Sequence, residues 1–194
     1  MKVLQVLHSM SSYTGENSLR WFRRTAQMLN LRQDSVKESI IANAPKKVTK
    51  VELGKMYLYE YDPKWKDKLP YWDRFPLIFV LNADSEGFLA LNLHYLSPTY
   101  RLAFFDKLNE FANDKRLSPK SKLMVQYKLI SDMSRFPETS VCIKRYLWTH
   151  VRTKFMEIPP TDWRNAVLLP LQSFQKKTDL SAWTYSSNKI RSRK

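Results

Sequence analysis

The chain has 194 residues, of which 43% are hydrophobic, and this composition excludes a wholly disordered protein. Its 33 Lys and Arg residues against 18 Asp and Glu give a formal net charge of +15, which favours a polyanionic partner such as nucleic acid. One cysteine excludes an internal disulfide, and three glycines exclude a Gly-rich loop for phosphate or dinucleotide binding.

The positive charge is concentrated in two parts of the chain. Residues 1–50 hold 9 basic and 3 acidic residues, and residues 119–194 hold 15 and 5, whereas residues 51–118 hold 9 and 10. Such basic flanks can neutralise phosphates and drive nucleic-acid binding without any contact to bases. A soluble protein with an ordinary basic surface is the alternative that the composition leaves open.

Three regions are expected from these patterns. Residues 1–50 form an N-terminal arm and a basic helix, residues 51–175 form an α+β core domain, and residues 176–194 form a basic, flexible tail. No secretory signal and no apolar stretch long enough for a membrane span is recognisable. The sequence leaves the oligomeric state open.

The first predicted helix begins near residue 18, after an arm rich in turn-forming residues. Leu19, Phe22 and Ala26 lie on one face of it. The other faces carry three candidate phosphate-binding residues, Arg20, Arg23 and Arg24, although a solvated polar face explains them equally well. Two further candidates, Lys46 and Lys47, lie in a basic linker over residues 43–50.

The central part of the chain predicts three antiparallel strands, over residues 55–61, 77–81 and 88–96. An aromatic loop over residues 64–74 joins the first two strands. A hairpin turn joins the second to the third, and we expect Gly87 there to adopt a positive φ. The fold class is therefore α+β, with a small antiparallel meander or an SH3-like barrel over about residues 55–96.

The C-terminal half is predicted to be mostly helical, with helices over residues 99–113, from Ser118, and over 139–156. The last of these rests on the spacing of four between Ile143, Leu147, Val151 and Phe155. Residues 163–169 fit either a short helix or a strand.

The predicted helix over residues 139–156 is the best candidate for a nucleic-acid contact, because basic residues alternate with aromatic ones. Its candidate residues are Lys144, Arg145, Trp148, Arg152 and Lys154. The basic tail adds Arg191 and Arg193. The alternative is a core helix with a solvated basic side.

Catalytic and metal-binding patterns are weak. Cys142 and His150 are two helical turns apart in the predicted helix, too far for proton transfer, and we expect Cys142 to be a small buried residue. Asp62 and Asp73 both flank predicted strands and could meet at one end of the sheet to hold Mg²⁺. Both also fit ordinary turns. We expect no cofactor, no metal site and no catalytic residue, with a Mg²⁺-dependent nuclease as the least favoured alternative.

Several segments carry a family resemblance: residues 56–64, 69–77, 87–96, 158–163 and 168–170. Over about residues 18–175 the chain resembles small proteins of contractile-tailed bacteriophages, some labelled DNA-end protectors and others virion proteins. The resemblance implies no catalytic residue.

The resemblance implies a non-enzymatic, DNA-binding protein at the packaged genome end or the head–tail connection. Its partners would be a linear duplex end and other virion proteins, without a membrane. It would be found in the virion, and in the host cytoplasm during assembly. The aromatic loop over residues 65–75 would act as a blocking wedge. The alternative is a structural protein of the neck, tail or baseplate, held by protein–protein contacts.

Overall fold

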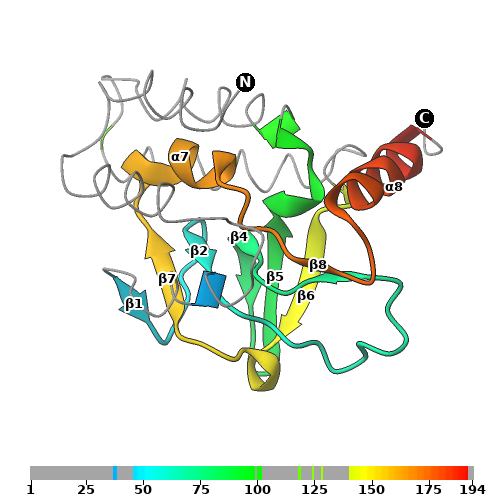
Figure 1. Ribbon diagram of the computed structural model, residues 1–194. Helices are drawn as coiled ribbons and strands as arrows, with labels where there is room; N and C mark the ends of the chain where they lie inside the picture. Colours follow the sequence, from blue (N-terminus) through cyan, green and yellow to red (C-terminus); the bar gives the residue numbers. More distant parts are fainter. Residues whose placement is uncertain are drawn as a thin grey trace.

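The computed structural model describes residues 37–38, 46–98, 100–101, 118, 124, 128 and 140–191 (Figure 1). The strands are β1 (Lys47–Val48), β2 (Met56–Leu58), β3 (Trp72–Asp73), β4 (Leu77–Ala83), β5 (Gly87–Asn92), β6 (Ile143–Leu147), β7 (Phe155–Ile158) and β8 (Phe174–Gln175). The α-helices are α7 (Trp163–Leu168) and α8 (Asp179–Arg191), and the 3-10 helices are η1 (Leu93–Tyr95), η2 (Trp148–His150) and η3 (Pro160–Asp162). This mixture confirms the α+β class.

The strands form a six-stranded sheet in the order β1-β7-β2-β4-β5-β6 and a two-stranded sheet of β3 and β8, all pairs antiparallel. The predicted meander is present as β2, β4 and β5. The larger sheet continues beyond the meander on both sides, because β7 pairs with β2 and β6 pairs with β5. The two outermost strands, β1 and β6, do not pair with each other in the described residues. The predicted SH3-like barrel is therefore not supported.

The predicted helix over residues 139–156 is wrong, because these residues form β6, η2 and the start of β7. A spacing of four is an even number, so it keeps side chains on one face of a strand as well as on one face of a helix. In β6 the exposed Arg145 is followed by the buried Tyr146, as expected for a strand with one covered face. A mostly helical C-terminal half is therefore not supported.

The predicted positive φ at Gly87 is wrong, because the structure records a positive φ at Gly54 and not at Gly87. Gly87 is needed instead for the close approach of two strands. A Cβ atom at residue 87 would lie 2.0 Å from the carbonyl oxygen of Tyr146 in β6. The turn before Gly87 is held by Asp84, whose Oδ1 accepts hydrogen bonds from the backbone N–H groups of Glu86 and Gly87 at 2.9 and 3.0 Å.

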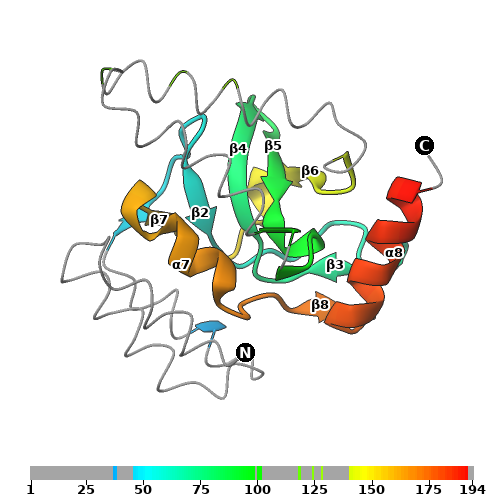
Figure 2. The same cartoon turned by 90° about the horizontal axis from the view of Figure 1, so that it is seen from above.

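The sheet separates two hydrophobic clusters. One contains Phe79 of β4 and Trp163 of α7, whose rings meet edge to face with centroids 4.8 Å apart. The other is aromatic and contains Tyr59, Phe88 and Tyr146. Figure 2 shows α7 beside β7 and β2, and α8 beside β8 at the other side of the molecule. Burial of both faces of the sheet accounts for its continuous apolar strands.

The structure differs from the expected flexible tail, since Asp179–Arg191 form α8. The helix is capped by Thr178, whose Oγ1 accepts a hydrogen bond from the backbone N–H of Ser181. Ala182 is fully buried, and the indole of Trp183 donates a hydrogen bond of 2.9 Å to the carbonyl of His94. These contacts attach α8 to η1. The predicted arm and the basic helix after residue 18 lie outside the described residues, as do most of the expected helices over 99–113 and from Ser118.

Candidate nucleic-acid interface

A groove of about 500 Å³ lies between the loop that precedes β3, the strand β6 and the helix α8. We call it the aromatic groove. Its aromatic lining consists of Tyr61, Trp65, Tyr71, Trp72, Tyr95, Tyr146 and Tyr185, and its cations are Lys64, Lys144, Arg145 and Lys189. These residues come from distant parts of the sequence, so the tertiary fold creates the groove.

The loop wall of the groove is held in place by Lys176. Its ammonium donates hydrogen bonds to the backbone carbonyls of Lys66, Asp67 and Leu69 at 2.7, 3.1 and 3.1 Å. These carbonyls belong to the hydrogen-bonded turns of residues 63–69, and a single ammonium with three donors can bind all three of them. Lys176 itself has a φ of 67°, in the left-handed region that is costly for a residue with a side chain.

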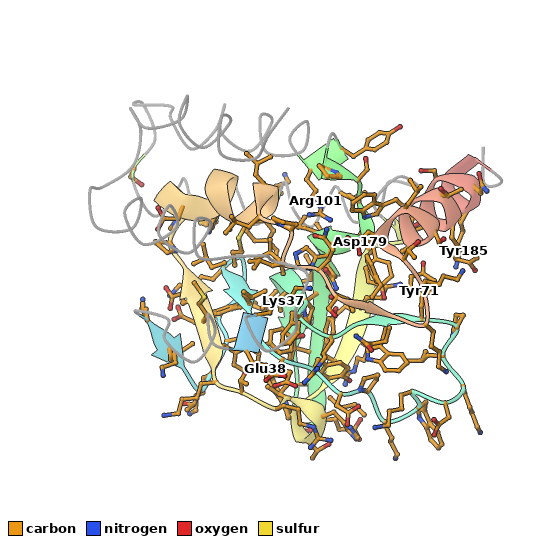
Figure 3. All side chains as sticks on the ribbon, in the orientation of Figure 1. Lys37, Glu38, Tyr71, Arg101, Asp179 and Tyr185 are labelled. Atoms are coloured by element: carbon orange, nitrogen blue, oxygen red, sulfur yellow. The ribbon has the colours of Figure 1, made fainter. Side chains whose placement is uncertain are left out.

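The rings of the groove are partly buried and partly exposed. Tyr71 lies in the floor, with its ring centroid 5.6 Å from that of Tyr95 and 5.7 Å from that of Tyr185. Trp65 is 56% exposed and Tyr185 is 44% exposed. Figure 3 shows Tyr71 and Tyr185 on the same side of the molecule, next to α8. The rings of Trp65 and Tyr185 are therefore accessible from solvent.

Lysine side chains accompany these rings. The ammonium groups of Lys64 and Lys68 lie 5.2 and 4.9 Å from the ring centroid of Trp65. The ammonium of Lys177 lies 4.8 Å from the ring of Tyr71 and 4.5 Å from that of Tyr185. Such contacts hold a cation at an aromatic face without neutralising its charge.

Lys144 of β6 is a more buried cation in the groove wall. Its ammonium lies 4.1 Å from the ring centroid of Tyr95. Burial, together with the nearby charge of Lys189, lowers the pKa of Lys144 to about 8. An anion bound in the groove would favour the charged form of this lysine.

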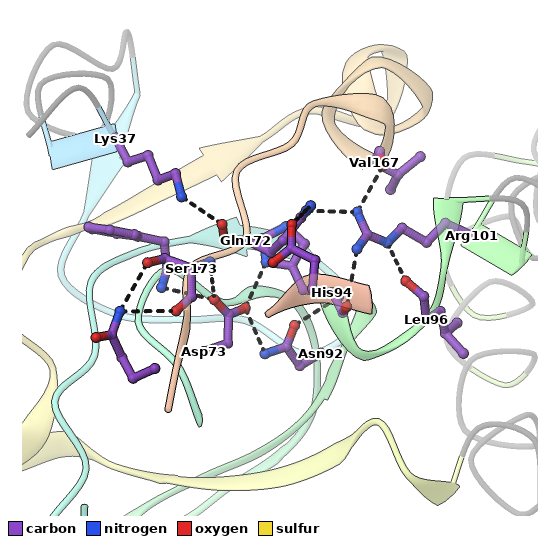
Figure 4. Close-up of polar contacts among 12 residues, drawn as sticks. Lys37, Asp73, Asn92, His94, Leu96, Arg101, Val167, Gln172 and Ser173 are labelled. Carbon is purple, nitrogen blue, oxygen red and sulfur yellow. Dashed lines mark hydrogen bonds and ion pairs between the residues drawn. The ribbon is translucent and has the colours of Figure 1, made fainter. Parts of the chain in front are cut away.

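A buried polar network supports the groove from beneath (Figure 4). Asp73 Oδ2 lies 2.7 Å from His94 Nδ1, and its Oδ1 accepts hydrogen bonds from the backbone N–H groups of Phe75 and Ser173. Burial disfavours the charged form of Asp73, but His94 and the hydrogen bonds bring its pKa below the ordinary value. Burial lowers the pKa of His94, so a neutral imidazole donates to an ionised Asp73. Asp73 also receives a hydrogen bond from Asn92 Nδ2.

Arg101 connects this network to its surroundings. Its guanidinium donates to the carbonyls of Leu96, His94 and Val167 and to Gln172 Oε1 (Figure 4). Gln172 in turn donates to Asp179 at the start of α8. The network therefore fixes α8, and with it Tyr185, against the sheet.

Of the predicted contact residues that the structure describes, two line the aromatic groove, Lys144 and Arg145. Arg145 also forms an ion pair with Asp84, whose backbone carbonyl accepts a hydrogen bond from the indole of Trp148. Lys46 is ion-paired with Glu157 at 2.7 Å, and Arg152 with Asp62 at 3.0 Å. Three further predicted residues are Lys47 in β1, Lys154 before β7 and Arg191 at the end of α8. The last four lie outside the described residues: Arg20, Arg23, Arg24 and Arg193.

Sequence reasoning did not select Trp65, Tyr185, Lys64, Lys68 or Lys177 as contact residues. The loop was expected to contribute a wedge, and the run Lys64-Trp65-Lys66-Asp67-Lys68 is the local signal that could have identified it. No such local signal indicated that α8 contributes to the groove, because the sequence of the tail is polar and basic.

The other candidates for chemistry are separated in the fold. Cys142 is buried as predicted, and burial raises the pKa of its thiol to about 12. Asp62 pairs with Arg152 and Lys66, whereas Asp73 belongs to the buried network. Within the described residues there is no group of three or more His, Cys, Asp or Glu placed to hold a metal ion. No helix in the described ranges is long and apolar enough to cross a bilayer.

The comparison with protein families is decisive. The family model described as Phage T4 terminal DNA protecting protein matches residues 5–194. The chain belongs to this family. The resemblance to the DNA-end protectors of contractile-tailed bacteriophages is thereby confirmed. No curated protein and no solved structure matches the chain.

Proposed function

We propose that this protein binds the ends of linear duplex DNA and prevents exonucleases from reaching them, without catalysing a reaction. The observation that carries this proposal is the family assignment over residues 5–194. The aromatic groove, with cations at its rim, and the net charge of +15 provide a surface suited to such a ligand.

Phosphate neutralisation supplies the affinity in this proposal. Lys64 and Lys68 are exposed, and neither is ion-paired with a carboxylate within the described residues. Both can therefore meet phosphates without first losing an internal partner. By contrast, Lys46, Arg145 and Arg152 would have to exchange a carboxylate for a phosphate. These three nevertheless remain proposed contacts, together with the other basic residues predicted from the sequence.

Protection also requires that the end be covered. The loop over residues 64–72 carries the exposed Trp65 and is fixed by Lys176, so it can present a firm surface to the last base pair. A protein of this kind acts where linear phage DNA has an end. We therefore place it at the genome end in the virion, next to other virion proteins, and in the host cytoplasm during assembly.

Competition binding tests the proposal. A labelled linear duplex is bound by the protein and challenged with equal masses of unlabelled linear DNA, cut to many ends, or of closed circular DNA. We expect the fragments with more ends to compete better, and log affinity to fall with log salt at about 0.9 per neutralised phosphate.

Three results would contradict the proposed function. Equal competition by linear and circular DNA would show that ends are not recognised, and absence of binding at low salt would favour a structural virion protein held by protein contacts. DNA that is cut during incubation with Mg²⁺ would contradict a non-enzymatic role.

A further inference from the structure

The size and lining of the aromatic groove point to a narrower ligand than a duplex. Its volume of about 500 Å³ lies within the roughly 300–1,000 Å³ of sites for small molecules. Such a groove can accommodate unpaired nucleotides of a single strand, but not two paired strands. We propose that the aromatic groove holds the unpaired terminal nucleotides of one DNA strand, so that the protein prefers an overhanging or frayed end to a blunt one. This inference rests on the proposed function.

The exposed rings provide the base-binding surface. Trp65 lies in the loop wall and Tyr185 in α8, and both keep about half of their surface exposed, at 56% and 44%. Tyr71 supports Tyr185 through an edge-to-face contact at an interplanar angle of 82°. Bases stack on such rings regardless of sequence, with about 1–3 kcal/mol per base.

The cations are placed for the phosphates of the same strand. The ammonium groups of Lys64 and Lys68 lie over the ring of Trp65, and that of Lys177 lies against the rings of both Tyr71 and Tyr185. A base that stacks on such a ring face takes the place of the ammonium lying there, and the displaced ammonium is then free to bind the phosphate of the same nucleotide. Among the described residues that line the groove, Asp73 is the only acidic one, and its two oxygens are occupied by His94, Asn92, Phe75 and Ser173. The accessible charge of the groove is thus positive.

An acidic peptide is the competing occupant. Its carboxylates would satisfy the lysines, but nothing in it would need two exposed rings beside them. A nucleotide uses the rings and the ammonium groups together, which favours single-stranded DNA.

The test compares DNA hairpins that differ only at the open end: blunt, with a three-nucleotide 5′ overhang, or with a three-nucleotide 3′ overhang. Each carries the fluorescent base 2-aminopurine at the terminal position. The variants are Tyr185→Ala and Trp65→Ala, with Trp65→Phe as the conservative replacement. Tyr100→Ala is the matched control, since Tyr100 is 61% exposed and does not line the groove. Thermal unfolding of each variant establishes that it is folded.

We expect at least one overhang to bind about tenfold more tightly than the blunt end, which corresponds to one stacked base. Tyr185→Ala and Trp65→Ala should each reduce this preference to less than about threefold, because each variant removes one stacking contact. Each should also abolish the fluorescence change of 2-aminopurine. Trp65→Phe and Tyr100→Ala should retain both.

Equal affinity for blunt and overhanging ends would overturn the inference, and so would a preference that survives both alanine variants. Displacement of the overhang by polyglutamate as readily as by an oligonucleotide would also overturn it, because charge alone would then explain binding. If any of these results is accompanied by preference for linear over circular DNA, the proposed function stands without the inference. If linear and circular DNA bind equally, the proposed function fails, and the inference fails with it.

Discussion

The ring of Tyr71, in the loop before β3, meets the ring of Tyr185, in α8, at 82° with centroids 5.7 Å apart, and Lys177 lies against both. This contact joins the central α+β region to a helix that the sequence presents as a basic tail. It places an exposed aromatic ring and a cation at one edge of the aromatic groove. The arrangement ties the fold of the C-terminal residues to the proposed binding of DNA.

The first prediction concerns the lysines beside Trp65. Lys64→Gln and Lys68→Gln should each weaken binding to linear DNA and reduce the salt dependence by about one phosphate contact. Lys66→Gln removes the same charge from the same loop, but Lys66 is already paired with Asp62 at 3.2 Å. Affinity and its salt dependence, measured by fluorescence anisotropy, should therefore change least in Lys66→Gln. Equal losses in all three variants would show that net charge alone matters.

The second prediction concerns the pH dependence of stability at Lys144. Its pKa of about 8 in the folded protein lies below the ordinary 10.5, so the unfolded chain binds more protons between these values. The free energy of unfolding should consequently rise with pH across this interval, by up to about 3 kcal/mol from this group. Chemical denaturation at pH 7.5 and 10 should show the rise, and the rise should be smaller in Lys144→Met. An identical pH dependence in that variant would contradict the assignment.

The third prediction concerns the anchor of the loop. Lys176→Met removes the hydrogen bonds to three carbonyls and should destabilise the protein by about 1 kcal/mol, while exposing the loop over residues 64–70 to proteolysis. Lys177→Met is the matched control, because Lys177 contacts rings and not this loop's backbone. Limited proteolysis followed by mass spectrometry measures the difference. Equal cleavage in both variants would show that Lys176 does not fix the loop.

The fourth prediction concerns Gly87. Gly87→Ala places a Cβ atom 2.0 Å from the carbonyl oxygen of Tyr146, so β5 and β6 must separate, at a cost of more than about 2 kcal/mol. Ala83→Gly, at an exposed position of the same hairpin, is a milder change for comparison. Denaturant titration should give a much lower midpoint for Gly87→Ala than for Ala83→Gly. Similar midpoints would contradict the close pairing of β5 with β6.

Local patterns sufficed for the central meander, because β2, β4 and β5 are short apolar strands with turn residues between them. They failed over residues 139–156, where the spacing of Ile143 and Leu147 satisfies a helix and a strand equally. Only the pairing with β5, some fifty residues away, decides between them. Long-range pairing of this kind is not encoded in the periodicity of one segment.

The candidate site was predictable only in part. Lys144 and Arg145 were selected for their charge and lie in the aromatic groove, and the loop around Trp65 was recognised as aromatic. The groove itself depends on Lys176 holding a loop more than one hundred residues earlier. It also depends on Arg101 and Gln172 fixing α8. A buried polar network joining such distant residues leaves no signature in the order of amino acids.

The decisive experiment for end protection is the degradation of linear duplex DNA by a processive exonuclease, with and without the protein. We expect protein added in slight excess over DNA ends to preserve full-length DNA, while a restriction endonuclease still cuts the same DNA at an interior site. Combining Lys64→Gln with Lys68→Gln should weaken the protection. Digestion at the same rate with and without the protein, or equal shielding of the interior site, would show that the protein does not protect DNA ends.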